Sequence, residues 1–307
     1  MFMKLAVYFT FLFALFAIAL LVVYWFIPVG EIDFGFKEPE NVNFSLSSSS
    51  AQKMQFYPNM RFSSERISYN LKDCQVQKEN DIETAFRILE NKTILEFYPT
   101  DFDEDVIITC DSRQKVEEGL FIAGEGGPTN ITQTEQFSII LHAKIMLIRE
   151  SSCPEPNIAL HEVFHVLGFD HSTNKYSIMY PVTNCRQEIG QDMIDLINEI
   201  YSIPSFPDLA FINVSAKRQG KYLNTEINIK NNGLSETLDS KLLIYAGNKL
   251  IKTIDIGFLG VGYGRRITLS NVWIVDSNFE TITYFIESDF NELSKENNKI
   301  VLEIEKG

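Results

Sequence analysis

The segment from His161 to His171, HEVFHVLGFDH, contains three of the four histidines in the 307-residue chain. On a helix, His161 and His165 lie one turn apart and point to the same side, with Glu162 beside them. Gly168 ends this helix, because glycine enters left-handed conformations at little cost, and the turn brings His171 round as a third ligand. Three neutral imidazoles bind zinc and leave its fourth position open, as a catalytic site requires.

The same helix must also pack against a core. Its opposite face carries four apolar residues at helical spacing: Leu160, Val163, Phe164 and Leu167. A chance match to the fixed positions of the motif has a probability of roughly one in ten thousand in a chain of this length. This rarity favours a metal site over the alternative of three unrelated surface or core histidines.

HEVFHVLGFDHS, followed by Ser177-Ile178-Met179-Tyr180-Pro181, resembles the metzincin signature HExxHxxGxxH with its Met-turn. Ser172 and the Met-Tyr-Pro turn point to the matrixin branch of that clan. The helix that contains Gln191-Asp192-Met193-Ile194 is similar to the last helix of matrixin catalytic domains. The resemblance covers about residues 66–202.

The resemblance implies a zinc-dependent endopeptidase that acts on a protein or peptide substrate. His161, His165 and His171 would bind the zinc, and Met179 would lie beneath it. Glu162 would be the general base that takes a proton from zinc-activated water. Extended substrates of the family lie antiparallel to an edge strand, whose counterpart here would be residues 128–132, unless these form a plain connecting turn.

Several features of matrixins are missing. Their second, structural zinc is held largely by histidines, but only His142 remains outside the motif, so no such site is expected. No cysteine precedes Cys74, so a thiolate latch on the zinc has no donor upstream. Calcium is possible at an acidic turn, for which a solvated surface turn is the alternative; the turn consists of Asp101, Asp103, Glu104 and Asp105.

Composition and the N-terminal segment bear on partners and location. A formal net charge of −14 argues against nucleic acid, because phosphate binding needs clustered Lys and Arg. Leu5 to Ile27 contains 23 residues without charge, Gly or Pro, and about 20 residues suffice to cross a bilayer as a helix. Lys4 before it, with Glu31 and Asp33 after it, predicts a cytoplasmic N-terminus. We expect a single-pass protein of the cell membrane with an extracellular catalytic domain; cleavage near Gly30 is the alternative.

Four cysteines follow the membrane segment and contain no CxxC pair. In an oxidising compartment an even number favours two disulfides, with three possible connectivities. Cys74–Cys110 and Cys153–Cys185 are favoured, because each then closes a loop within one half of a single domain. Buried free thiols are the alternative.

The expected organisation is an N-terminal signal anchor (1–30), a flexible linker (31–65), a zinc metallopeptidase domain (66–206) and a β-sandwich domain (207–307). The metallopeptidase domain is α+β, with a mixed sheet and the active-site helix. Asp81 is expected to cap a helix with an apolar stripe, and a last helix closes the domain. The stripe consists of Ile82, Ala85, Phe86 and Leu89, and the last helix carries Met193, Ile194, Ile197 and Tyr201.

The C-terminal part is expected to be an all-β immunoglobulin-like sandwich. It contains seven β-prone runs, which begin at Leu209, Glu226, Lys241, Leu250, Arg266, Thr281 and Ile300. Pro207-Asp208-Leu209, Asn231-Asn232-Gly233 and NELSKENN (Asn291–Asn298) resemble the CARDB group of cell-adhesion-related sandwiches. That resemblance identifies no ligand. The alternative to the endopeptidase is therefore a non-catalytic surface adhesion or binding protein with a structural zinc domain. Glu162 argues against this alternative, because a domain with a purely structural zinc would not need that carboxylate.

Overall fold

The computed structural model describes residues 9–19, 31–35, 54–112, 115–117, 120–274 and 279–304. Residues 9–19 form an apolar helix within the predicted anchor, and the remainder of the anchor lies outside the described residues. Within the described ranges, no helix is both long enough and apolar enough to span a bilayer.

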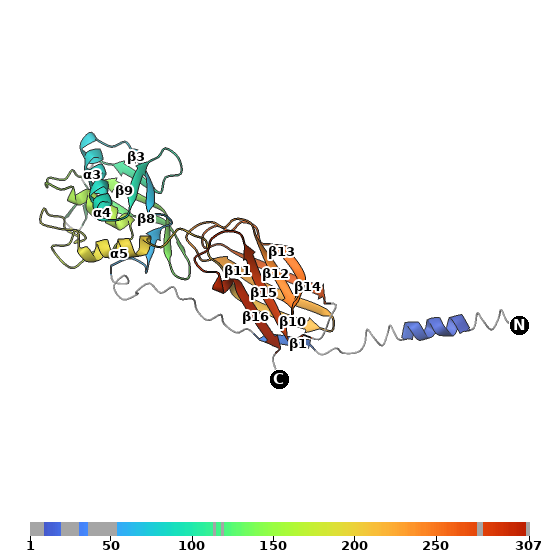
Figure 1. Cartoon of the computed structure of the whole chain (residues 1–307). Helices are drawn as coiled ribbons and strands as arrows, with labels where there is room; N and C mark the ends of the chain where they lie inside the picture. The colour runs from blue at the N-terminus through green and yellow to red at the C-terminus, as the bar shows by residue number, and fades with distance from the viewer. Residues whose placement is uncertain are drawn as a thin grey trace.

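The first domain is built on a six-stranded sheet with the order β2-β9-β5-β3-β4, in which β8 pairs with β9 (Figure 1). The β8–β9 pair is antiparallel and the other pairs are parallel, so the mixed sheet expected from the sequence is confirmed. The strands are β2 (Met60–Phe62), β3 (Arg66–Lys72), β4 (Glu96–Pro99), β5 (Val106–Cys110), β8 (Gly124–Gln133) and β9 (Ser138–Leu147). A separate hairpin consists of β6 (Lys115–Glu117) and β7 (Leu120–Ile122).

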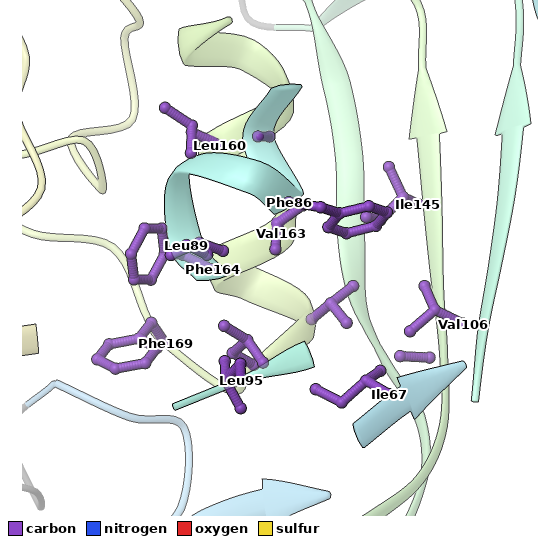
Figure 2. Close-up of a cluster of buried hydrophobic side chains, with 14 of the residues drawn as sticks. Ile67, Phe86, Leu89, Leu95, Val106, Ile145, Leu160, Val163, Phe164 and Phe169 are labelled. Atoms are coloured by element: carbon purple, nitrogen blue, oxygen red, sulfur yellow. The ribbon is translucent and has the colours of Figure 1, made fainter. Parts of the chain in front are cut away.

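Helices α3 (Val76–Lys92) and α4 (Asn157–Val166) pack together beside this sheet, and α5 (Gln191–Tyr201) closes the domain. Figure 2 shows Phe86 and Leu89 of α3 close to Val163 and Phe164 of α4. All four side chains are at most 3% exposed, and burying a large apolar side chain contributes about 1.5–3 kcal/mol. The apolar stripes predicted on both helices therefore form one core.

The prediction that Asp81 caps α3 is wrong. The helix begins at Val76, and Asp81 lies in its second turn. The Asp81 carboxylate accepts hydrogen bonds from the side chain of Gln77 (3.2 Å) and from the backbone N–H of Ser151 (3.2 Å). Asp81 thus ties α3 to the loop before α4.

Both predicted disulfides are present. Cys74–Cys110 joins the segment just before α3 to the end of β5, and Cys153–Cys185 joins the loop before α4 to the loop before α5. Each bridge therefore joins two segments that are far apart in the sequence.

The predicted linker, residues 31–65, contains two strands, β1 (Glu31–Gly35) and β2. β2 belongs to the first domain, where Arg61 is fully buried and donates to the carbonyls of Ile200 and Ile203 at the end of α5. β1 belongs to the second domain. Both strands pair with segments far along the chain, which local composition cannot reveal.

The second domain is an antiparallel sandwich with all seven predicted strands. They are β10 (Leu209–Gln219), β11 (Tyr222–Asn231), β12 (Ser240–Ala246), β13 (Lys249–Asp255), β14 (Gly264–Trp273), β15 (Thr281–Ser288) and β16 (Lys299–Ile304). The strand order is β13-β12-β15-β16-β1-β10-β11-β14. β1 therefore joins two groups of strands, since it pairs with β16 on one side and β10 on the other.

The two domains meet at the β8–β9 hairpin. Phe137 and Ile139 form a buried apolar cluster with Ile203 and with Leu234 of the sandwich. The ammonium group of Lys230 donates to the carbonyl of Gln133 at 3.2 Å. The sandwich thus contacts the end of β8 that is remote from the histidine motif.

Candidate metal centre

Helix α4 places the first two histidines side by side. His161 and His165 are 6% and 7% exposed, and their ring centroids are 4.6 Å apart. The helix ends where predicted: Gly168 has φ of 91°, and its N–H bonds to the carbonyl of His165 at 3.0 Å. A Cβ at Gly168 would lie 2.7 Å from Met60 Cγ, so the turn requires glycine for both conformation and space. His171 follows on the exposed side of the turn.

The three imidazoles converge through one nitrogen each. His165 Nε2 lies 3.0 Å from His161 Nε2 and 3.2 Å from His171 Nε2. His161 Nδ1 donates to the carbonyl of Ile178 at 2.7 Å, and His165 Nδ1 donates to that of Phe169 at 2.8 Å. These bonds fix both tautomers, because a carbonyl only accepts, and they leave the Nε2 lone pairs facing one another.

This arrangement fits zinc. A tetrahedral zinc with bonds of about 2.0–2.1 Å places its ligand nitrogens about 3.3 Å apart, close to the two Nε2 distances. Lone pairs at this separation repel unless a cation lies between them. Burial lowers the pKa of His161, and it lowers that of His165 to about 4 with help from His161. Both rings are therefore held as the neutral species that binds metal.

A segment upstream of the histidine motif also shapes the centre. The N–H of Phe56 donates to the carbonyl of Gly168, and the N–H of Asp170 donates to the carbonyl of Met54, both at 2.9 Å. The ring of Phe56 stacks on His165 with centroids 5.9 Å apart and planes 18° apart. These residues fall in the predicted linker, and no periodicity or motif in that stretch indicates them.

The Met-turn is joined by hydrogen bonds to His161 and to Ser172, the residue after His171. Met179 is 1% exposed, and its carbonyl accepts a hydrogen bond from the N–H of Ser172 at 2.8 Å. Its neighbour Ile178 provides the carbonyl that holds His161. The turn therefore fixes one ligand and the start of the segment that follows His171.

Glu162 is 5% exposed, and burial together with the charge of Glu125 raises its pKa to about 8. Its side chain lies against strand β8. A Cβ at Gly124 would lie 2.7 Å from Glu162 Oε1, and one at Gly126 would lie 2.6 Å from the Glu162 carbonyl oxygen. These two glycines let the strand backbone approach the carboxyl group closely.

A cleft of about 1230 Å³ opens over the histidines and Glu162. One wall is β8, and another is the segment after the Met-turn, from Pro181 to Thr183. Among the described strands, β8 pairs only with β9, so no described strand covers its other edge. The strand beside the site is residues 124–126, whereas residues 128–132, expected there from the sequence, lie farther along β8 towards the sandwich.

The acidic turn does not gather into a calcium site. Glu104 binds Lys72 at 3.0 Å, and the Asp105 carboxylate accepts from the Ser68 N–H and hydroxyl at 2.7 Å each. His142 is exposed, with Nδ1 3.3 Å from the Glu104 carbonyl oxygen. Across the described residues, the three motif histidines are the only group of three His, Cys, Asp or Glu side chains placed to hold a metal ion.

Comparison with known families and structures agrees with this geometry. Residues 61–202 match the matrixin family model, peptidase family M10. A search of curated proteins found no match. The match supports a zinc metallopeptidase function in general terms.

Solved structures similar to the chain include two small domains. One is the CARDB domain of a Pyrococcus furiosus protein in complex with di-metal ions, at 20% identity and a TM-score of 0.28, covering 32% of this chain and 87% of that domain. The other is a domain of a Methanosarcina acetivorans protein assigned to the cell surface, at 13% identity and a TM-score of 0.27, covering 33% and 95%. The resemblance to the matrixin family expected from the sequence is thus found again. Residues 61–202 match the matrixin family model and are referred to below as the matrixin domain.

Proposed function

We propose that this protein is a zinc-dependent endopeptidase anchored in the cell membrane, with its catalytic domain outside the cell. The observation that carries the proposal is the convergence of three Nε2 atoms at the floor of a cleft, with a buried carboxyl group beside them. His161, His165 and His171 would hold the metal. A zinc ion there would polarise the scissile carbonyl and lower the pKa of a coordinated water to about 7.

The protein groups divide the remaining work. Glu162 is not a ligand; its carboxylate takes a proton from the attacking water and delivers that proton to the leaving amine nitrogen. The edge of β8 that lines the cleft offers backbone N–H and C=O groups to a substrate in extended conformation, as in strand addition. The neutral tautomers of His161 and His165 are held by Ile178 and Phe169, so the ligand rings need no reorientation.

The membrane location rests on the sequence of residues 5–27, which is long and apolar enough for one crossing. Its flanking charges favour a cytoplasmic N-terminus, with the residues after the segment outside the cell. Two disulfides fit an exported domain, because such bonds persist in oxidising compartments.

The test compares the purified protein with its Glu162→Ala variant on unfolded casein, with zinc content measured on both. We expect one zinc in each protein, and cleavage by the unmodified protein alone, abolished by a chelator. Cleavage by the variant would overturn the role of Glu162. Zinc in both proteins without cleavage of any of several substrates would favour the non-catalytic adhesion protein.

A further inference from the structure

The sandwich has two distinct ends. Leu209 begins β10 directly after the matrixin domain, and Gln219 ends it, so these residues lie about 30–35 Å apart along the strand. At the Gln219 end, β1 begins: Glu31 pairs with Gln219. Figure 1 shows β1 at the end of the sandwich that is remote from α3 and α4.

The proposed anchor is tied to this remote end by a short connection. Three residues separate Ile27, the last residue of the apolar segment, from Glu31. A chain of this length spans at most about 14 Å even when fully extended. If residues 5–27 cross the bilayer, the Gln219 end must lie close to the bilayer surface.

Two large aromatic side chains are exposed at that end. Tyr222 pairs with Gln219 on one side and with Trp273 on the other. Tyr222 and Trp273 are 43% and 49% exposed, and their rings meet edge to face at 5.3 Å. The ammonium group of Lys221 lies 5.5 Å from the Trp273 ring. The two aromatics lie about 10–15 Å to the side of β1, because neighbouring strands are about 4.8 Å apart.

We propose that Tyr222 and Trp273 insert into the headgroup region of the membrane, so that the sandwich stands on the bilayer and holds the active site away from it. This proposal rests on the membrane anchoring proposed above. Tyr and Trp favour the membrane–water interface, because one end of each ring is apolar and the other polar. A Lys beside them can extend its apolar stem along the ring and keep its charge among the headgroups.

The chain offers a direct test, because it contains only two tryptophans, Trp25 and Trp273. The full-length protein is reconstituted into phosphatidylcholine vesicles in two forms. Trp25→Phe leaves Trp273 as the reporter, and Trp273→Phe leaves Trp25. Tryptophan emission is then recorded with lipids brominated near the headgroup or near the bilayer centre, and with aqueous iodide.

A third form reports on the opposite end of the sandwich. Phe258 is 56% exposed and precedes Leu259, whose carbonyl accepts a hydrogen bond from Asn231 beside the matrixin domain. Phe258→Trp, in a chain that also carries Trp25→Phe and Trp273→Phe, should be quenched by iodide and insensitive to brominated lipid.

We expect Trp273 emission to be blue-shifted, quenched several-fold more by lipids brominated near the headgroup than near the centre, and shielded from iodide. If Trp25 is quenched by brominated lipid while Trp273 behaves like the tryptophan at position 258, the anchor is real and the surface contact is wrong. If Trp25 is not quenched either, both the anchoring and the surface contact are overturned.

Discussion

Among the described residues, each domain has one buried carboxyl group, and the two groups differ in their surroundings. Glu162 in the matrixin domain is 5% exposed, and both burial and the charge of Glu125 raise its pKa, to about 8. Asp208 in the sandwich is 8% exposed, and burial raises its pKa too. However, the side chain of Asn297 donates to Asp208 at 3.0 Å and opposes that rise.

The surroundings of the two carboxyl groups distinguish a group that is available for chemistry from a group that stabilises the fold. Asp208 is held by donors from its own domain, as buried charges in stable structures usually are. Glu162 instead faces a cleft and lies against the bare backbone of two glycines. A buried ionisable group that faces a cleft is a candidate functional residue, whereas one that is surrounded by hydrogen-bond donors stabilises the structure.

The largest effect is expected from exchanging each carboxyl group for its amide. Glu162→Gln should lower the rate of peptide cleavage by about 10²–10⁴-fold, because general base catalysis is lost, with zinc content unchanged. Asp208→Asn should leave the rate unchanged. Initial rates on a fluorogenic peptide measure both, and equal losses in the two variants would remove the distinction between the two groups.

A buried cation extends the comparison. The guanidinium group of Arg61 is enclosed by carbonyl acceptors and lies 4.6 Å from the ring centroid of Tyr201. Arg61→Met leaves carbonyls at the end of α5 without donors, so the free energy of unfolding should fall by about 3 kcal/mol. Urea denaturation measures this.

The control for Arg61→Met is Arg66→Met, which removes the ion pair between Arg66 and Glu96. The side chains of these two residues are 62% and 68% exposed. That variant should lose less than about 1 kcal/mol. Similar losses in the two variants would show that the burial of Arg61 adds nothing to the free energy of unfolding.

A neutral pair within the sandwich should show a smaller effect. The hydroxyl of Thr225 donates to the carbonyl of Ser215, so the fully buried hydroxyl of Tyr284 donates to Thr225, at 2.6 Å. Tyr284→Phe should therefore lower the free energy of unfolding by about 1 kcal/mol. Tyr222→Phe, at an exposed tyrosine, should change it by less than half of that amount, as thermal or urea unfolding can show.

The smallest effect concerns pH. Since the pKa of Asp208 is higher in the folded protein than its ordinary value of 3.8, ionisation favours the unfolded state. The penalty is absent below pH 3.8 and grows as pH rises through the folded pKa. The stability of the unmodified protein relative to Asp208→Asn should thus decline as pH rises above 3.8; a rise in relative stability over this range would contradict the direction of the shift.

The parts of the molecule that follow local rules could be predicted from the sequence. The histidine spacing fixed one helix face, and alternation within runs such as residues 226–230 located the strands of the sandwich. The two disulfides followed from keeping each loop within half a domain. The helix and the strands depend on residues within one or two turns or strands of each other, whereas the disulfides span 36 and 32 residues and were limited to three connectivities by the small number of cysteines.

Features that depend on distant partners could not be predicted. β1 forms because it pairs with Ala216 to Gln219 of β10 on one side and with Glu303 to Ile304 of β16 on the other. Nothing near residue 31 in the sequence indicates these partners. Phe56 likewise gains its role only when the turn at Gly168 lies beside it.

The position of β1 has a consequence for what happens when the chain is cut. From the proposed anchor, the chain first forms β1 in the sandwich and only then reaches the matrixin domain. β1 is therefore a strand that the N-terminal part of the chain contributes to the sandwich. A protease that cleaved once between Gly35 and Met54 would break the backbone but leave β1 paired with β10 and β16. If residues 5–27 anchor the chain in the membrane, as proposed above, the nicked ectodomain would stay attached to the anchor without a covalent link, and its release would require β1 to separate from β10 and β16.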